Sequence, residues 1–402
     1  MTRSANRWNH VALVLGAASY ACLLFVWFLL PAFLSPVIAD LSLSNWQAGV
    51  LVGAVPLTYI PLSLLSGLAI DRVGPRLGVG LGLSIFGLAG AGRSVAADFP
   101  SLLACTLLVG VGATGITFGL PKLVADLFPP ERTGSASTVY VLGSYAGSAG
   151  AFAVGRPLLG PALGGWRPTF LYTGLAAVAF ALVWGLATAR IEPRSGDESR
   201  TFSLGSLRED ADRVLSNPAM LLLVVVGTAY LSASHGLQGW LVTLFEARGV
   251  RPALAGLTTT VLVAGQVVGA LSLPPLSDRL SARRPAVVLS GMLVTGGTLV
   301  LLVAESALVI AALGIVAVGI GLGGVGPLLR AIPVELEGIG PGLTATAVGF
   351  VFAVGELGGF LGPFLVGSLR DLTGSFAPGL TVIALAGIAI AAAGWRMTGV
   401  DS

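Results

Sequence analysis

The stretch GLAIDRVGPR (residues 67–76) decides the fold, because it is a short charged turn between two long apolar segments. A related stretch, LPPLSDRLSARR (273–284), also ends an apolar segment, and the Asp-Arg pairs of the two stretches are 207 residues apart. KLVADLFPPERTG (122–134) and RAIPVELEGIGPG (330–342) form a second pair, 208 residues apart. Two landmarks at nearly the same offset indicate that the chain consists of two related halves.

The composition predicts a protein whose solvent is mostly lipid. The chain has 402 residues, of which 55% are hydrophobic and 10% are charged, and its mean hydropathy is +0.91. A soluble domain carries about a quarter charged residues. Segments of about 20 apolar residues, the length that a helix needs to cross a bilayer, occur about twelve times. We therefore expect an all-α membrane protein with twelve transmembrane helices in two pseudo-symmetric six-helix bundles.

Polar residues and basic residues predict the domains and the orientation. One long polar segment separates the sixth apolar span from the seventh, so we expect bundles over 1–189 and 217–402 with a cytoplasmic linker at 190–216. Of the 22 Lys and Arg residues, 16 fall on the side of the membrane that holds both termini, and six, among them Arg93 and Arg156, fall on the other. The positive-inside rule then predicts a multi-pass protein of the cytoplasmic membrane with both termini in the cytoplasm.

Several function classes are not expected. The net charge of +3 is too small to indicate nucleic-acid binding, and Cys22 and Cys105 lie in apolar spans, which argues against a disulfide or metal framework. The sequence contains no nucleotide-binding G-x-x-x-x-G-K-[ST] motif, no paired metal-ligand motif and no G-x-S-x-G elbow. We therefore predict no enzyme activity and no cofactor or metal, with energy from an ion gradient or from the substrate's own gradient.

The opening stretch resembles the signature of the loop between helices 2 and 3 in the major facilitator superfamily, G-x-L-A-D-R-x-G-R-K. Pro75 replaces the first basic residue of the final pair. The resemblance implies twelve helices, small-molecule transport by alternating access and a monomer. It also implies a conformational latch, in which the aspartate ties helix ends together and the basic residues cap carbonyls; the latch residues are Asp71, Arg72, Arg76, Asp278 and Arg279. Plain topological anchoring is the alternative.

Three longer stretches, at 119–137, 235–249 and 355–376, resemble the uptake carriers for small anions, among them nitrate/nitrite porters and cyanate-permease-like proteins. Nitrate porters place a substrate-binding arginine in helices 2 and 8, and this chain has none there. Tyr59 and Gln266 are the polar residues midway in these spans and are 207 residues apart. The resemblance thus implies a small-solute carrier, and the missing arginines favour an anion other than nitrate or an uncharged solute.

Glu356 lies in AVGELGGFLGP (353–363), inside a glycine-rich apolar span. The internal repeat aligns it with Ser148, and the related anion carriers normally have Asn there. Carboxylates within transmembrane helices are costly and often mark ion or proton paths. We expect Glu356 to couple proton movement to transport; a structural carboxylate that braces a helix contact is the alternative.

Other polar residues are candidates for substrate binding. His235 and Gln238 are spaced i, i+3 in the seventh span and therefore share a face. The family implies that this helix faces the central cavity, so we predict substrate contacts from Tyr59, His235, Gln238, Gln266 and Arg156. Interhelical hydrogen bonding is the alternative for His235 and Gln238, and snorkelling is the alternative for Arg156.

A symmetric basic pair, Lys122 and Arg330, is predicted near the inner ends of the fourth and tenth spans. These residues either line the inner vestibule and receive an anion or cap helix ends. The sequence therefore predicts a secondary transporter for proton-coupled uptake of an organic or inorganic anion. A drug or metabolite exporter by proton antiport is the alternative, and GPALGG (160–165) resembles the antiporter signature of drug exporters.

Overall fold

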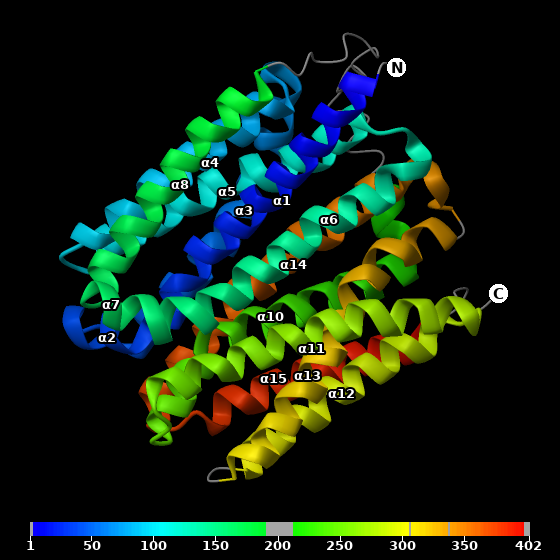
Figure 1. Cartoon of the computed structure of the whole chain (residues 1–402). Helices are drawn as coiled ribbons and strands as arrows, with labels where there is room; N and C mark the ends of the chain where they lie inside the picture. The colour runs from blue at the N-terminus through cyan, green and yellow to red at the C-terminus, as the bar shows by residue number, and fades with distance from the viewer. Residues whose placement is uncertain (1–2, 190–211, 305–306, 337, 398–402) are drawn as a thin grey trace. The chain divides into compact units, whose positions relative to one another are not determined.

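The computed structural model consists of helices and short connections throughout the residues that it describes, which are 3–189, 212–304, 307–336 and 338–397 (Figure 1). The first half of the chain contains α1 (Arg3–Ala32), α2 (Leu34–Leu41), α3 (Asn45–Val73), α4 (Pro75–Gly92), the 3-10 helix η1 (Arg93–Val95), α5 (Phe99–Leu127), α6 (Pro130–Gly150), the π-helix η2 (Ala151–Leu159), α7 (Gly160–Leu163) and α8 (Trp166–Thr188). The second half contains α10 (Pro218–Ala247), α11 (Pro252–Arg279), α12 (Arg283–Val303), α13 (Leu308–Glu335), α14 (Gly340–Thr373) and α15 (Ala377–Arg396).

The helices are long and apolar enough to cross a membrane. Ten helices of the described chain pass this criterion singly, and α3 adds an eleventh when its two parts are counted together. α6 continues into η2, so the two cover the fifth position of the twelve spans that the sequence predicts. The all-α prediction and the number of spans therefore agree with the structure.

The chain forms two compact units. The N-terminal unit comprises Met1–Leu43 and Pro61–Ser199, and the C-terminal unit comprises Ser44–Ile60 and Arg200–Ser402. The first part of α3 thus packs with the second half of the chain, which the sequence did not suggest. The predicted limits, 1–189 and 217–402, stay a prediction, and most of the predicted linker lies outside the described residues.

Helix packing repeats within the two units. In the N-terminal unit α1 packs on α6, and α4 packs on both α5 and α8. In the C-terminal unit α10 packs on α14, and α12 packs on both α13 and α15. These are the same positions in a six-helix order, so the repeat of the sequence is also a repeat of packing.

Small residues permit these close contacts. In the N-terminal unit, a Cβ at Gly143 or Gly147 of α6 would overlap the backbone of α1 at Ala17 or Ala21. In the C-terminal unit, a Cβ at Gly269 of α11 would overlap the carbonyl of Ile320 in α13. Because lipid tails are as apolar as leucine, membrane helices gain stability from such close backbone packing rather than from hydrophobic burial.

The start of α5 shows how local sequence defines a helix end. Asp98 is the N-cap, and its Oδ1 accepts a hydrogen bond from the Ser101 amide at 2.9 Å, while the Ser101 hydroxyl accepts one from the Asp98 amide at 3.2 Å. This reciprocal arrangement is a capping box. The hydrogen bonds from Ser101 lower the pKa of the Asp98 carboxyl from its usual value.

Candidate functional site

The glycine-rich run of α14 is a packing surface for α10. A Cβ at Gly358 would overlap the carbonyl oxygen of Thr228, and one at Gly362 would overlap that of Ser232. A Cβ at Gly355 would lie 3.0 Å from Leu231 and 3.3 Å from the backbone of Gly227. The glycines at 355, 358 and 362 therefore let α14 pack closely on α10, and we call this contact the seam. Glu356 is a carboxylate within this run.

The first part of α3 packs on the opposite side of the same run. A Cβ at Gly53 would lie 2.9 Å from the Phe360 carbonyl oxygen, and one at Gly49 would lie 2.6 Å from that of Pro363. α14 is thus held between α10 and the first part of α3 within the C-terminal unit. Side chains that this seam encloses have little access to water.

Glu356 lies next to His235 in this seam. A Cβ at Gly359 would be 2.9 Å from Glu356 Oε2, 3.2 Å from His235 Cδ2 and 3.1 Å from Pro56 Cβ. The carboxylate and the imidazole are therefore neighbours, with α3 beside them. Oε2 of Glu356 is buried and has no hydrogen-bond partner among the described residues. A carboxylate oxygen in such a place is costly in its charged form.

A group of amides lies one turn further along α10. Gln238 Nε2 donates to Ser234 Oγ at 3.1 Å and to Gln266 Oε1 at 3.4 Å. Gln266 Nε2 donates to the same Ser234 oxygen at 3.3 Å. All three side chains are buried. The sequence places Gln238 and Gln266 in different spans, and the structure joins them through Ser234.

Tyr59 belongs to the same unit. Its side chain is buried in the first part of α3, and it is three residues beyond Pro56, so the two share a face of the helix. Four of the five predicted substrate contacts (Tyr59, His235, Gln238 and Gln266) thus lie in the C-terminal unit together with Glu356. Their role in substrate binding stays a prediction.

Arg156, the fifth predicted contact, belongs to the N-terminal unit. It lies in the π-helix η2, one residue before Pro157, and its guanidinium carbon is 5.4 Å from the centroid of the Phe33 ring. π-helical turns are rare and frequently occur at functional sites. The cation is therefore held against an aromatic ring of the same unit by an unusual stretch of backbone.

The predicted latch residues make different contacts in the two units. Asp71 forms an ion pair with Lys122. Arg76 donates to Thr188 Oγ1 at 3.2 Å and to the Ala189 carbonyl at 3.3 Å, so it caps the end of α8. Arg72 is exposed at the end of α3. These contacts tie the end of α3 to α5 and the start of α4 to the end of α8. The switching role stays a prediction.

In the C-terminal copy, Asp278 forms an ion pair with Arg283 rather than with the tenth-span basic residue. Arg283 also pairs with Glu335, with Nη2 2.7 Å from Oε1. Arg279 is exposed at the end of α11. One arginine that the sequence analysis did not single out therefore holds both carboxylates at this end of the unit.

The two residues of the predicted basic pair make different contacts. Lys122 forms an ion pair with Asp71. Arg330 donates to the Gly326 carbonyl at 2.8 Å, its guanidinium carbon lies 4.4 Å from the centroid of the Phe352 ring, and no ion pair involves it within the described chain. The inner-vestibule role predicted for both residues is untested, but their surroundings differ.

One buried cation was missed by the sequence analysis. Arg93, which the loop count assigns to the outer side, is 1% exposed. Its Nε donates to Thr106 Oγ1 and its Nη1 donates to the Val26 carbonyl, both at 3.2 Å. Arg93 therefore links η1 to α5 and α1. A single arginine at the end of an apolar span carries no signal of burial, so the sequence could not distinguish it from a loop residue.

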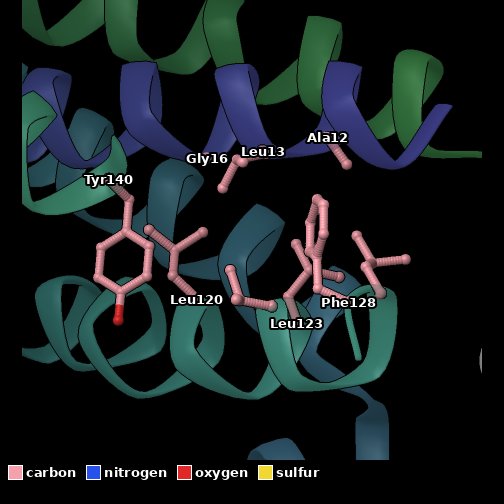
Figure 2. A pocket seen from close by; sticks show the side chains of 9 residues that line it. Ala12, Leu13, Gly16, Leu120, Leu123, Phe128 and Tyr140 are labelled. Atoms are coloured by element: carbon pink, nitrogen blue, oxygen red, sulfur yellow. The ribbon is translucent and has the colours of Figure 1, made fainter. Parts of the chain in front are cut away.

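A small apolar pocket lies elsewhere in the N-terminal unit. Figure 2 shows Ala12, Leu13 and Gly16 of α1 facing Leu120 of α5 and Tyr140 of α6. The Tyr140 hydroxyl is the polar group among the side chains drawn. The pocket offers no charge to an anion, so it contributes nothing to the chemistry predicted from the sequence.

Comparisons with known proteins agree with this architecture. A bacterial homolog to the human lysosomal transporter Spinster, solved in an inward-facing and occupied conformation, superposes with a TM-score of 0.77 at 18% identity, covering 98% of this chain and 96% of that one. The 3-(3-hydroxy-phenyl)propionate transporter of Escherichia coli is 29% identical over 361 residues, which are 86% of this chain and 85% of that protein. The nitrite extrusion protein of Bacillus subtilis is 28% identical over 398 residues, 95% of this chain and 92% of that protein.

The family model named Major Facilitator Superfamily matches residues 16–363. This match covers both units and most of α14. The predicted fold class, twelve transmembrane helices in two six-helix bundles, is therefore confirmed. So is the resemblance read from the stretch at 67–76: the chain is a multi-pass membrane transporter of the Major Facilitator Superfamily.

Proposed function

We propose that this transporter takes up a small organic or inorganic anion together with protons by alternating access, and that Glu356 carries the proton. The observation that supports this most strongly is the buried Oε2 of Glu356, which lacks a hydrogen-bond partner in the described structure and lies beside His235. Beside it, the glycines of α14 pack closely on the backbone of α10. Such a carboxylate is stable there when neutral and costly when charged.

Coupling follows from this difference in cost. When the seam is closed, Glu356 holds a proton and contributes no charge to the bilayer. When water reaches the carboxylate, the proton can leave and the charged form is solvated. Because protonation compensates the charge of an anionic substrate, the loaded carrier with one proton and one monovalent anion moves no net charge.

The chemistry of the relatives supports an anionic substrate. Curated relatives are named for 3-(3-hydroxy-phenyl)propionate, for nitrite and for tartrate, the last in Agrobacterium vitis at 26% identity. We propose that Tyr59, His235, Gln238, Gln266 and Arg156 contact the substrate. Gln238 and Gln266 offer amide groups that can exchange their mutual hydrogen bonds for bonds to a ligand. We place the carrier in the cytoplasmic membrane as a monomer with both termini inside.

Export by proton antiport is the second candidate. Its support is the similarity to a nitrite extrusion protein and to a quinolone resistance transporter of Acinetobacter baumannii, which is 24% identical over 377 residues. The two directions have opposite consequences in cells. Deleting an importer lowers accumulation of the substrate, and deleting an exporter raises the toxicity of the substrate.

Purified protein reconstituted into liposomes tests the proposal. An inward proton gradient should drive accumulation of one or more anions from a panel of monocarboxylates, dicarboxylates, nitrate and nitrite. Glu356→Gln should abolish the accumulation and leave substrate exchange without a gradient intact. Glu246→Gln, at the end of α10, is the matched control and should behave as the wild type. If Glu356→Gln accumulates substrate fully, Glu356 does not carry the proton.

A further inference from the structure

Arg330 and Tyr230 lie together in the C-terminal unit. A Cβ at Gly326 of α13 would be 3.3 Å from the Tyr230 hydroxyl oxygen of α10 and 3.6 Å from Arg330 Nη1. The Arg330 guanidinium also stacks on Phe352 of α14. Three helices thus contribute a cation, a hydroxyl and a ring to one place.

The position of the guanidinium argues against simple snorkelling. Arg330 is near the inner end of α13, and a snorkelling side chain would extend toward the nearby water. The hydrogen bond to Gly326, four residues earlier, instead holds the guanidinium one turn back toward the middle of the helix. Phe352, on which it stacks, is four residues before Glu356 and therefore shares its face of α14.

Among the described residues of the unit, Arg330 has no carboxylate partner. Arg283, at the same end of the unit, has two carboxylate partners, Asp278 and Glu335. Arg330 is exposed, and the contacts that the structure gives it, a carbonyl and a ring, carry no formal charge. A guanidinium has five N–H donors in a planar fork that matches a carboxylate in a bidentate manner. Most of these donors remain available to a ligand.

We propose that Arg330, Tyr230 and Phe352 form the subsite that binds the carboxylate of the substrate, and that the substrate is a monocarboxylate. Arg330 pairs with the carboxylate, Tyr230 donates a hydrogen bond to it, and Phe352 keeps the guanidinium plane in place. One cation without a carboxylate partner among the described residues matches one carboxylate. The inference rests on the proposed function, since it names the class of anion carried.

Binding to the purified carrier, measured without transport, tests this subsite. The probes are 3-phenylpropionate, its uncharged amide, tartrate and nitrate, and the readouts are calorimetric affinity and the shift of the unfolding temperature. The wild type should bind 3-phenylpropionate more tightly than the other three probes. Arg330→Gln should lose about tenfold or more in affinity, the range for a charge-assisted hydrogen bond. Arg330→Lys should recover part of it, because lysine keeps the charge and loses the fork.

Arg284→Gln is the matched control, because Arg284 also stacks on an aromatic ring of this unit, at 4.5 Å from the centroid of Trp395. It should bind 3-phenylpropionate as the wild type does. Tyr230→Phe should lose affinity a few-fold and provides a second test if Arg330→Gln does not fold. Unchanged affinity in both variants, equal binding of the amide, tighter binding of tartrate, or no binding by the wild type would overturn the inference.

The outcomes separate the two proposals. If Arg330→Gln binds 3-phenylpropionate as well as the wild type while the wild type accumulates it under a proton gradient, this subsite is wrong and the proposed function survives. If the carboxylate binds through Arg330 but no proton gradient drives its accumulation, the subsite stands and proton coupling fails. Glu356→Gln should still bind the probe, since residue 356 lies one turn of α14 beyond Phe352.

Discussion

The two units share one scheme of helix packing, but equivalent side chains differ in their charge and in the partners of that charge. Ser148 of α6 and Glu356 of α14 occupy equivalent positions in the repeat, and each has a buried side-chain oxygen without a hydrogen-bond partner in the described part of the chain. In the N-terminal unit that oxygen is a neutral hydroxyl, and Lys122 is neutralised by Asp71. In the C-terminal unit it belongs to a carboxylate, and the equivalent of Lys122 is Arg330, which forms no such ion pair among the described residues.

At these two pairs of equivalent positions, the N-terminal unit thus has a neutral group and a paired cation, and the C-terminal unit has a carboxylate and a cation whose described contacts carry no formal charge. A duplicated fold requires the helix contacts to be kept in both copies, since both seams depend on small residues. It does not require the same polar side chains. One copy can therefore acquire ionisable groups while the other remains a stable partner.

The largest effect should come from Glu356→Ser, which gives the C-terminal unit the residue of the N-terminal unit. With a proton gradient of about one pH unit, coupling to one proton supports about tenfold accumulation, because one pH unit corresponds to about 1.4 kcal/mol. Accumulation in the variant should fall to the level without a gradient. Flux of radiolabelled substrate into liposomes measures this. Ser148→Ala is the control and should accumulate substrate as the wild type does.

The next largest effect should come from the seam that both units share. Gly358→Leu places a side chain against the Thr228 carbonyl, and Gly147→Leu places one against the Ala21 carbonyl. Each should destabilise its unit by about 1–3 kcal/mol or more, the usual cost of overpacking. Unfolding temperature in detergent and the yield of monodisperse protein measure it. Gly296→Leu is the control, because a Cβ there meets open space. Equal stability of all three variants would contradict the close contacts.

The sequence predicted the parts of this arrangement that depend on periodicity. Hydrophobic length predicted the spans, and the matched turns at 67–76 and 273–284 predicted the repeat. The glycine-rich run at 353–363 is typical of a close helix contact, because only small residues permit one. These features are local, so each can be recognised from a few neighbouring residues.

The sequence could not predict contacts between distant side chains. Gln238 and Gln266 were candidates on separate helices, and nothing local indicated that Ser234 joins them. Asp278 was expected to act as Asp71 does, but it pairs with Arg283, the first residue of α12, and not with a basic residue of the tenth span. Buried Arg93 gave no signal at all. Pairing across helices depends on the rotation of each helix, which an apolar sequence with a weak helical periodicity does not specify.

A smaller effect should distinguish the ion pairs of Arg283 from the ion pair of Lys122. Arg283→Gln removes two carboxylate contacts from a side chain that is 15% exposed, and should destabilise the C-terminal unit by about 1–2 kcal/mol. Lys122→Gln breaks one pair whose members are 37% and 57% exposed, and should cost about 0–1 kcal/mol. Thermal unfolding at low and high salt measures both. A larger loss in Lys122→Gln would reverse the assignment of structural roles at these ends.

The smallest effect should come from the cap of α3, where the two units again differ. In the N-terminal unit α5 is capped by its own neighbour, Asp98. In the C-terminal unit the start of α3 is capped by Asp371 of α14, 326 residues away, whose Oδ1 lies 3.0 Å from the Asn45 amide and whose Oδ2 lies 2.7 Å from the Trp46 amide. Ser44 and Gln47 add a local capping box, with the Ser44 amide 2.9 Å from Gln47 Oε1.

Asp371→Asn should therefore cost about 0.5 kcal/mol, because the local capping box remains when the distant carboxylate is neutralised. Ser44→Ala should cost about as much, and the double variant should cost more than the sum, since one side-chain amide oxygen then has to serve the Asn45, Trp46 and Gln47 amides. The stabilisation of α5 by the Asp98 cap depends on pH. Its lowered pKa means that its contribution is present at neutral pH and is lost as the pH falls through that pKa. Hydrogen exchange at the first amides of α3 and α5 reports each cap separately. If Asp371→Asn leaves exchange at Asn45 and Trp46 unchanged, the distant cap contributes nothing, and the first part of α3 is held in the C-terminal unit by its packing on α14 alone.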